Sequence, residues 1–330
     1  MSGSRIAVVT GGAGFIGSHV VDLLIERGFA VRVIDDLSGG REANLAHLAG
    51  DPGLAFEVRD IRQLEADDPL FVGANVVFHF AGIGDIVPSI ERPLDYLSVN
   101  VMGTARVLEA ARAASVGRVV YAASSSCYGL AMVPTAEDHP IDARHPYALS
   151  KYLGEETVFH WHHVYGLPVA SIRIFNAYGP RVRTTGAYGA AFGVFLRQKL
   201  AGAPFTVVGD GTQRRDFVYV TDVAEAFLRA GENGGAGAVY NLGTGNPQTV
   251  NRLVELLGGA VEHIPGRPGE PDCTWADISK IENQLGWRPK VPFEEGVRRM
   301  VACIEDWRDA PLWDADSIAE ATRDWHRYLS

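Results

Sequence analysis

The 330-residue sequence has few cysteines, no long hydrophobic run and little positive charge. Its three cysteines, Cys127, Cys273 and Cys303, are odd in number and far apart, which favours buried free thiols over a disulfide framework. No apolar segment approaches the roughly 20 residues that a membrane span needs, and the first residues lack a signal-peptide pattern. We therefore expect a cytoplasmic protein that does not bind to membranes.

Metal-ligand patterns are missing as well. The ten histidines form no H-E-x-x-H pattern, and the cluster His160, His162 and His163 fits the polar face of a helix, so we expect no metal site. Thirty Lys and Arg against 40 Asp and Glu give a formal net charge of −10. This balance disfavours nucleic acid, which requires a broad positive surface. Anionic ligands must instead be bound by a few well-placed arginines.

The sequence is 47% hydrophobic and contains 37 glycines, enough for one large α/β unit or two domains. Residues 5–10 predict a buried strand, residues 11–17 a glycine-rich turn, and residues 18–27 an amphipathic helix. Glycines let the backbone turn tightly and approach a pyrophosphate, whose charge the amide groups of the following helix then bind. One such motif alone is weak evidence, because tight turns often mimic it.

A second predicted strand, residues 30–34, ends at Asp35 and Asp36. A carboxylate at this distance from the glycine motif is typical of one that binds the adenosine ribose hydroxyls. Because it would repel a 2′-phosphate, it favours NAD over NADP.

Strand and helix patterns continue to alternate, with strands at 54–58, 76–81 and 118–122 and a long helix after Pro93. This alternation predicts a Rossmann-type, doubly wound parallel sheet of the α/β class, with ligands at the carboxyl ends of its strands. Several candidate residues fall at or near such ends: Asp60, Ala81, Gly82, Asn100 and Ser124.

Tyr147 and Lys151 are four residues apart, so on a helix they share one face. A free tyrosine titrates near pH ~10, and a neighbouring cation would favour its phenolate. Taken in isolation, such a pair is usually a packed ring and a solvated charge.

In the first half, the motifs are 10–17, Asp60-Ile61, Phe80-Ala81-Gly82, Asn100, Ser124-Ser125-Ser126, Tyr147-x-x-x-Lys151 and 173–176; the second half adds 209–213, 215–220, 241–245, 267–270 and 285–287. Together they resemble the extended short-chain dehydrogenase/reductase family, and within it the NAD-dependent nucleotide-sugar 4-epimerases. The resemblance runs to about Met300.

The resemblance implies an NAD site formed by Gly11, Gly14, Phe15, Ile16, Gly17, Asp35, Asp36, Asp60, Ile61, Phe80, Ala81, Gly82, Asn100, Tyr147 and Lys151. It also implies that Tyr147 takes the proton of a sugar 4-hydroxyl while Ser124 shares a hydrogen bond. Lys151 is expected to lower the pKa of Tyr147 and to hold the nicotinamide ribose. The 4-keto sugar would turn over in the site, and NAD would be regenerated there.

The substrate contacts implied by the resemblance are Ser124, Ser125, Ser126, Tyr147, Asn176, Ala190, Ala191, Arg215, Arg267, Glu270 and Thr274. Arg215 and Arg267 would clamp the nucleotide diphosphate, since guanidinium groups match phosphate oxygens, and Glu270 would accept from a ribose hydroxyl. A small residue at Thr274 would leave room for a 2-acetamido group. We therefore expect UDP-GlcNAc and UDP-GalNAc, their uronic acids or plain UDP-hexoses as substrates, with Arg183 as a partner for a C6 carboxylate.

Alternatives stay open on the same scaffold. Dehydratases and decarboxylases that resemble this chain carry an acid just before the Tyr-Gly pair, where this sequence has Ser125, Ser126 and Cys127. That difference favours a 4-epimerase, although epimerases at other carbons are not excluded. A binding protein without turnover would be expected to lack Tyr147 or Lys151. The sequence departs from the family pattern at Gly84, Ala123, His145 and Ile174.

We expect an NAD-binding domain over 1–180, with later strands near 215–245 returning to it, and a mainly substrate-binding part over 181–330 that ends in a helical extension from Trp307. The resemblance further implies a homodimer through the helix after Pro93 and the helix starting at Tyr147. Apolar positions that fit this pairing are Val101, Val107, Leu108, Leu153, Val158 and Trp161.

Overall fold

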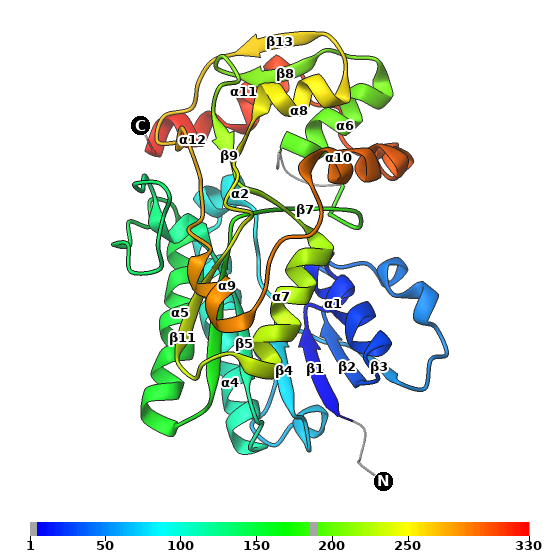
Figure 1. The fold of residues 1–330 in the computed structure, drawn as a ribbon, viewed down its shortest axis with the longest axis vertical. Helices are drawn as coiled ribbons and strands as arrows, with labels where there is room; N and C mark the ends of the chain where they lie inside the picture. The colour runs from blue at the N-terminus through cyan, green and yellow to red at the C-terminus, as the bar shows by residue number, and fades with distance from the viewer. Residues whose placement is uncertain (1–4, 185–190, 330) are drawn as a thin grey trace.

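The computed structural model describes residues 5–184 and 191–329. Its largest element is a seven-stranded sheet in which every pairing is parallel, with the order β11-β6-β5-β4-β1-β2-β3 (Figure 1). The strands are β1 (Ile6–Thr10), β2 (Ala30–Asp35), β3 (Leu54–Val58), β4 (Val76–His79), β5 (Val119–Ser124), β6 (Val169–Ile174) and β11 (Ala238–Leu242). The strand order reverses between β1 and β4, which confirms the predicted Rossmann-type α/β fold.

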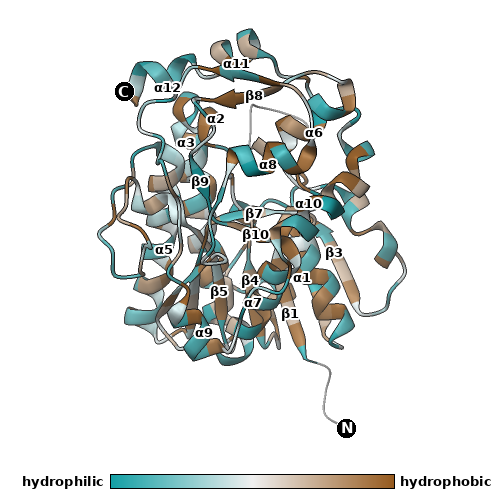
Figure 2. Ribbon diagram, turned by 45° about the horizontal axis from the view of Figure 1, so that its top comes forward, coloured by the Kyte–Doolittle hydropathy of each residue, from teal (hydrophilic) through white to brown (hydrophobic). Residues whose placement is uncertain are grey.

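Helices cover both faces of this sheet. Alternate residues of β1 belong to different cores: Ala7 and Val9 pack with one set of helices, and Val8 packs with the other. The first set is α1 (Phe15–Glu26), α7 (Val220–Asn233) and α9 (Ser279–Leu285), and the second is α4 (Thr104–Ala113) and α5 (Pro146–Tyr165). Figure 2 shows hydrophobic residues along the central strands, as a sheet covered on both faces requires.

The long helix expected after Pro93 is continuous but not uniform. It consists of α3 (Pro93–Leu97), a π-helical segment (Ser98–Gly103) and α4. Before it lies the short helix α2 (Ile86–Glu91). Single-turn 3-10 helices cover Glu42–Asn44, Ala46–Leu48, Ile61–Gln63, Pro69–Phe71 and Ser125–Tyr128. Widened π turns are frequent at functional sites, and this one carries Asn100.

A third hydrophobic core lies beyond the carboxyl edge of the sheet. It gathers α6 (Ala191–Ala201), α8 (Val250–Leu257), α10 (Phe293–Ala302), a 3-10 turn (Ile304–Trp307), α11 (Ala315–Ala321) and the parallel pair β8 (Phe205–Val208) and β13 (Val261–Ile264). Helix α12 (Arg323–Tyr328) follows α11. Of the two strands expected to return to the large sheet, β11 lies in it. Strand β10 (Phe217–Tyr219) pairs instead with β7 (Asn176–Tyr178).

The remaining pair, β9 (Arg214–Arg215) with β12 (Gln248–Thr249), is antiparallel and short. Within the described residues, none of the helices has the length and apolarity that crossing a membrane would take.

A buried ion pair fastens α5 to the sheet. Glu155 of α5 is 1% exposed and accepts hydrogen bonds from Arg173 of β6 at 2.7 and 3.0 Å. The hydroxyl of Ser171, also on β6, donates to the same carboxylate at 2.5 Å. Arg173 additionally donates to the Tyr128 hydroxyl at 2.8 Å. Every charge in this cluster therefore has a partner, which a buried charge requires.

We predict that Glu155→Ala lowers the free energy of unfolding by about 3–5 kcal/mol, because it leaves the Arg173 guanidinium buried without a counter-charge. Urea denaturation measures this change. Glu156→Ala is the matched control, since Glu156 is the next residue on α5 and is exposed; it should shift the free energy by no more than about 0.5 kcal/mol. Similar values for the two variants would show that the ion pair does not anchor the helix.

Candidate active site

A cleft of about 1580 Å3 runs along the carboxyl edge of the sheet, between the sheet and the third core. Pockets for one small ligand typically measure about 300–1,000 Å3, so this cleft has room for two. It is lined by all the predicted site residues of the described chain except Asn100. Ala190 and most of the predicted stretch 186–192 lie outside the described residues, whereas Ala191 lines the cleft at the start of α6.

The glycine turn after β1 is too tight for side chains. A Cβ on Gly11 would lie 2.6 Å from the Ala81 nitrogen, and one on Gly17 would lie 2.1 Å from the Gly11 oxygen. Gly14 is the N-cap of α1 and has no side chain to bond the first amide groups of the helix. Those groups and the close backbone fit the pyrophosphate of a dinucleotide.

Asp35 and Asp36 follow at the end of β2, as predicted. Asp35 is 5% exposed and accepts from the amide groups of Ala13 (3.0 Å) and Leu37 (2.8 Å), so it also fixes the glycine turn. Burial raises the pKa of Asp35, and these amide groups oppose the rise. Asp36 is exposed on the cleft wall, and Asp60 is paired with Arg62, which lowers the pKa of Asp60. The part of the cleft lined by Asp35, Asp36 and Asp60 therefore suits a ribose with free hydroxyls.

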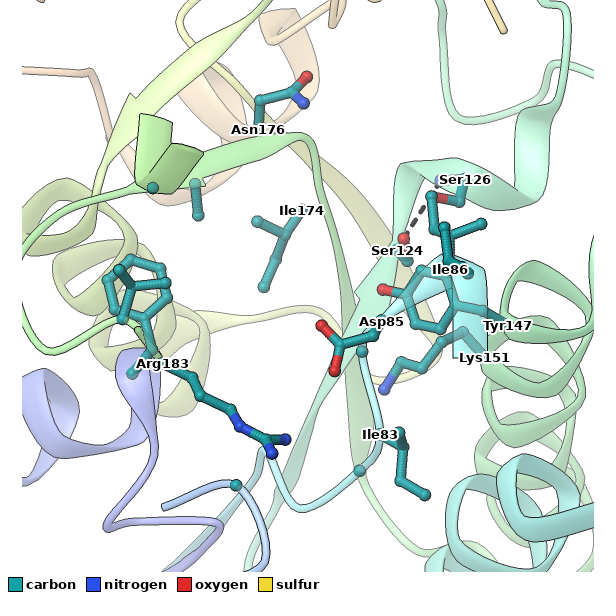
Figure 3. Close-up of a pocket in the computed structure, with 18 of the residues that line it drawn as sticks. Ile83, Asp85, Ile86, Ser124, Ser126, Tyr147, Lys151, Ile174, Asn176 and Arg183 are labelled. Carbon is teal, nitrogen blue, oxygen red and sulfur yellow. Dashed lines mark hydrogen bonds between the residues drawn. The ribbon is translucent and has the colours of Figure 1, made fainter. Parts of the chain in front are cut away.

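The hydroxyl groups of Tyr147 and Ser124 and the ammonium of Lys151 point into the same part of the cleft (Figure 3). Ser124 ends β5, and its oxygen accepts the Ser126 amide at 3.2 Å, which leaves the Ser124 proton available. Tyr147 is the second residue of α5 and Lys151 lies one turn further along. The structure therefore brings together the three residues predicted to be catalytic.

The pKa of Tyr147 differs from the expectation of a lowered value. Burial raises it, the hydrogen bond with Ser124 opposes the rise, and the charge of Asp85 raises it further. The Lys151 ammonium lies 4.4 Å from the ring centre of Tyr121, where it makes a cation–π contact. Burial lowers the pKa of Lys151 to about 8, and the Glu155 carboxylate opposes that shift.

Asn100 lies behind the cleft wall and is 1% exposed. Its side chain accepts from the Ile83 amide at 2.8 Å and donates to the Ser150 hydroxyl at 2.9 Å, so it joins the 80–83 segment to α5. A Cβ on Gly82 would lie 2.8 Å from the Asn100 side-chain oxygen and 3.7 Å from the Lys151 nitrogen. Asn100 therefore leaves no space for a side chain at position 82, and the backbone of Gly82 stays accessible beside Lys151.

His79 extends this support to the glycine turn. Its Nδ1 is 2.6 Å from the Thr10 hydroxyl and its Nε2 is 2.9 Å from the Thr104 hydroxyl. Thr104 donates its own proton to the Asn100 carbonyl, so Nε2 of His79 must be the donor and Nδ1 the acceptor. Burial lowers the pKa of His79 to about 3, which keeps this ring neutral. The network is complete and rigid.

On the other side of the cleft, Glu270 lies between the two predicted phosphate-binding arginines. Arg215 donates to it at 2.7 Å, and an Arg267 nitrogen lies 3.8 Å from its other oxygen. Thr274 donates to the side-chain oxygen of Asn176 at 2.8 Å. The predicted substrate residues of the second half are therefore close to one another.

Two groups were missed by sequence reasoning. Asp85 is the N-cap residue of α2, yet its side chain makes no cap hydrogen bond; its carboxylate points into the cavity beside Tyr147, facing the side on which Arg183 lies (Figure 3). Trp325, near the end of the chain, lines the cleft as well. The sequence pattern predicts no helix directly after Asp85, and local spacing does not show that this side chain turns inward.

Among residues 5–184 and 191–329, no three His, Cys, Asp or Glu side chains cluster as metal ligands, and the three cysteines are free thiols.

Residues 7–243 match the model of the NAD dependent epimerase/dehydratase family. The chain is 38% identical over 304 residues to a putative UDP-glucose 4-epimerase of Methanocaldococcus jannaschii, covering 89% of this chain and 96% of the relative. Among solved structures, it resembles the UDP-N-acetylglucosamine 4-epimerase of Methanobrevibacter ruminantium in complex with UDP-N-acetylmuramic acid. That comparison gives a TM-score of 0.86 and 31% identity, over 92% of this chain and 98% of that one. The chain also resembles the UDP-glucuronic acid 4-epimerase of Bacillus cereus in complex with UDP-glucuronic acid and NAD. That comparison gives a TM-score of 0.85 and 29% identity, over 92% of this chain and 99% of that one.

Proposed function

Because this chain belongs to the NAD-dependent epimerase/dehydratase family, we propose that it is a 4-epimerase of UDP-linked sugars that keeps its NAD bound. The observation that carries the proposal is the convergence of the Tyr147 and Ser124 hydroxyls and the Lys151 ammonium in one cleft large enough for a dinucleotide and a nucleotide sugar. NAD, when bound in this cleft, would supply the hydride acceptance and return at C4 of the sugar that epimerisation requires.

The chain's own residues manage the proton of the sugar O4. Ser124 accepts the Ser126 amide, so its hydroxyl proton is free to be donated toward Tyr147 or the sugar oxygen. Tyr147 would take the O4 proton as its phenolate and later return it. Burial raises the pKa of Tyr147, so the phenolate must be favoured by a nearby positive charge. Lys151 supplies a positive charge in a nearly dry site, 7% exposed, where a charge acts strongly.

The two sides of the cleft divide the binding work. Within 1–180, the glycine turn, Asp35 and Gly82 are proposed to hold NAD, with Asn100 supporting Gly82 from behind. Within 181–330, Arg215 and Arg267 are proposed to bind the diphosphate once a substrate ribose draws Glu270 to itself. Both arginine side chains are 12% exposed, and buried guanidinium groups bind phosphate oxygens firmly.

The sugar pocket favours neutral substrates. Thr274 is small and bonded to Asn176, which leaves space for a 2-acetamido group. Arg183 would attract a C6 carboxylate, but the Asp85 carboxylate in the same cavity would repel it. We therefore propose UDP-GlcNAc and UDP-GalNAc as preferred substrates, UDP-glucose and UDP-galactose as secondary ones, and uronic acids as poor ones.

We predict that Tyr147→Phe lowers turnover by roughly 10²–10⁴-fold, the usual effect of removing a general base, while NAD and UDP-sugar still bind. The assay incubates wild type and variant with a panel of UDP-sugars, without added NAD, and separates the products. Near-normal epimerisation by the variant would contradict the role of Tyr147.

The same panel tests the alternatives. A 4-keto-6-deoxy or decarboxylated product from wild type would replace the 4-epimerase proposal and would make Asp85 the candidate eliminating acid. Inversion at another carbon would show that the protein is an epimerase that does not act at C4. Binding of NAD and UDP-sugar with no product at all would identify a binding protein.

We predict that Thr274→Tyr closes the space beside Asn176 and therefore reduces kcat/KM for acetylated sugars at least about tenfold more than for plain hexoses, because overpacking excludes the larger group. Thr274→Ser, which keeps the hydroxyl and the space, is the matched control and should behave like wild type. Equal losses on both sugar classes would show that Thr274 does not select the substrate.

The surface of α3 to α5 supports the proposed homodimer. Among the apolar positions expected there, Val107, Leu108 and Val158 are fully buried inside the subunit, whereas Leu153 is 36% exposed. Further exposed apolar side chains on these helices are Leu94, Met102, Leu149, Val164 and Tyr165. We call these exposed residues the α3–α5 patch, and we propose that a second subunit covers them.

We predict sedimentation at twice the 35.6 kDa of one chain and dissociation to monomers in a Leu149→Glu/Leu153→Glu variant, which buries charge at the interface. Val261→Glu is the control, because Val261 is 40% exposed on β13, away from this patch. A monomeric wild type at micromolar concentration would contradict the dimer.

A further inference from the structure

The end of the chain forms part of the active-site cleft. The motifs that resemble the family end at Trp287, and about a tenth of this chain lies outside the match to the Methanocaldococcus relative, which covers 89% of this chain and 96% of the relative. Figure 1 shows α12 beside the C-terminus, and this helix packs against α2. Trp325 and Tyr328 of α12, and Leu329 directly after it, line the cleft. Trp325 is only 7% exposed although just five residues follow it in the sequence.

One aromatic ring, that of His145, lies between Trp325 and Tyr147. The Trp325 ring is 6.3 Å from the ring of His145, and the His145 ring is 5.9 Å from that of Tyr147 and parallel to it within 7°. These separations are within the range in which aromatic pairs attract. Burial lowers the pKa of His145 to about 4, so the middle ring is neutral at neutral pH.

Tyr147 lies at the start of α5, where the helix itself gives its ring little support, so the contact with His145 matters. Side chains of a helix lean toward its N-terminus and pack on the preceding turn, but Tyr147 is the second residue of α5 and has no preceding turn. His145 takes that place: its Nδ1 caps the helix by accepting the Ala148 amide at 3.1 Å, and its ring covers one side of Tyr147. Trp325 in turn prevents His145 from swinging away.

Trp325 also touches the nucleotide side of the cleft. Its indole nitrogen donates to the Pro268 carbonyl at 2.8 Å, inside the loop that carries Arg267 and Glu270. The same loop meets the end of the chain at a second point, because a Cβ on Gly269 would lie 3.1 Å from the Leu329 oxygen. The C-terminal segment therefore braces the loop as well as His145.

We propose that Trp325 is a positioning residue for both halves of the active site: its ring holds His145 against Tyr147, and its indole N–H fixes the loop 267–271 that binds the nucleotide. The proposal rests on the proposed function for the roles of Tyr147, Arg267 and Glu270. Small displacements of a catalytic group cost large factors in rate, about 10²-fold for ~1 Å, so a brace of this kind controls turnover.

The two contacts can be separated by substitution. Trp325→Phe keeps an aromatic ring beside His145 but loses the donor to Pro268, so KM for the UDP-sugar should rise about three- to tenfold while kcat stays within about twofold of wild type. Trp325→Ala loses both contacts, so KM should rise similarly and kcat should fall at least about tenfold. His326→Ala, on the exposed side of the same helix, is the control and should match wild type.

A double-mutant cycle tests the path through His145. If Trp325 acts on Tyr147 through that ring, Trp325→Ala should lower kcat much less in a His145→Ala background than in wild type. Melting temperature and NAD content of each variant, measured alongside, identify any that fail to fold, and the Phe variant then carries the test of the loop contact.

Identical behaviour of the Phe and Ala variants, or unchanged kcat and KM in Trp325→Ala, would overturn the proposal. So would fully additive effects in the cycle, which would show that Trp325 and His145 act separately. Failure of the proposed function looks different, because wild type itself would then lack epimerase activity. In that case UDP affinity, measured by calorimetry on wild type and Trp325→Phe, still decides whether the indole braces the loop.

Discussion

The buried carboxylate of Glu155 is the constraint on which the rest of the site depends. A charge this deep must be paired, and Arg173 on β6, the strand next to the edge strand β11, pairs with it, so the ion pair fixes how α5 lies on the sheet. Tyr147, Lys151 and Glu155 are spaced at intervals of four residues, so fixing the last fixes the face on which the other two lie. The Arg173 contacts continue through Tyr128 to Asn241 on β11, which joins the second half of the chain to the same cluster.

The parallel sheet then determines what Tyr147 meets. Because all seven strands end at one edge, the glycine turn, Asp35, the 80–82 segment, Ser124 and Asn176 line a single cleft although they are far apart in sequence. Neutral polar groups hold the wall behind it, from Thr10 through His79 and Thr104 to Asn100. The far wall comes from the third core and from the C-terminal segment.

Local patterns predicted much of this arrangement. The strand-turn-helix pattern around Gly11, the acids after β2 and the spacing of Tyr147 and Lys151 all depend on neighbours in sequence, and the structure places them as expected. Long-range effects could not be predicted in that way. Three features depend on which segments meet in space: the direction of the Asp85 side chain, the burial of Asn100 behind the cleft wall, and the packing of Trp325 near His145. Burial, which local spacing does not show, likewise raises the pKa of Tyr147.

The central claim is that hydrogen at C4 of the sugar is taken up and returned within this cleft, while Tyr147 handles only the proton of O4. Epimerisation of a UDP-sugar in D2O, without added NAD and followed by mass spectrometry and NMR of the product, tests it most directly. The account predicts an inverted product with no carbon-bound deuterium. Deuterium at C4, or at C3 or C5 next to it, or an absolute need for added NAD, would contradict it.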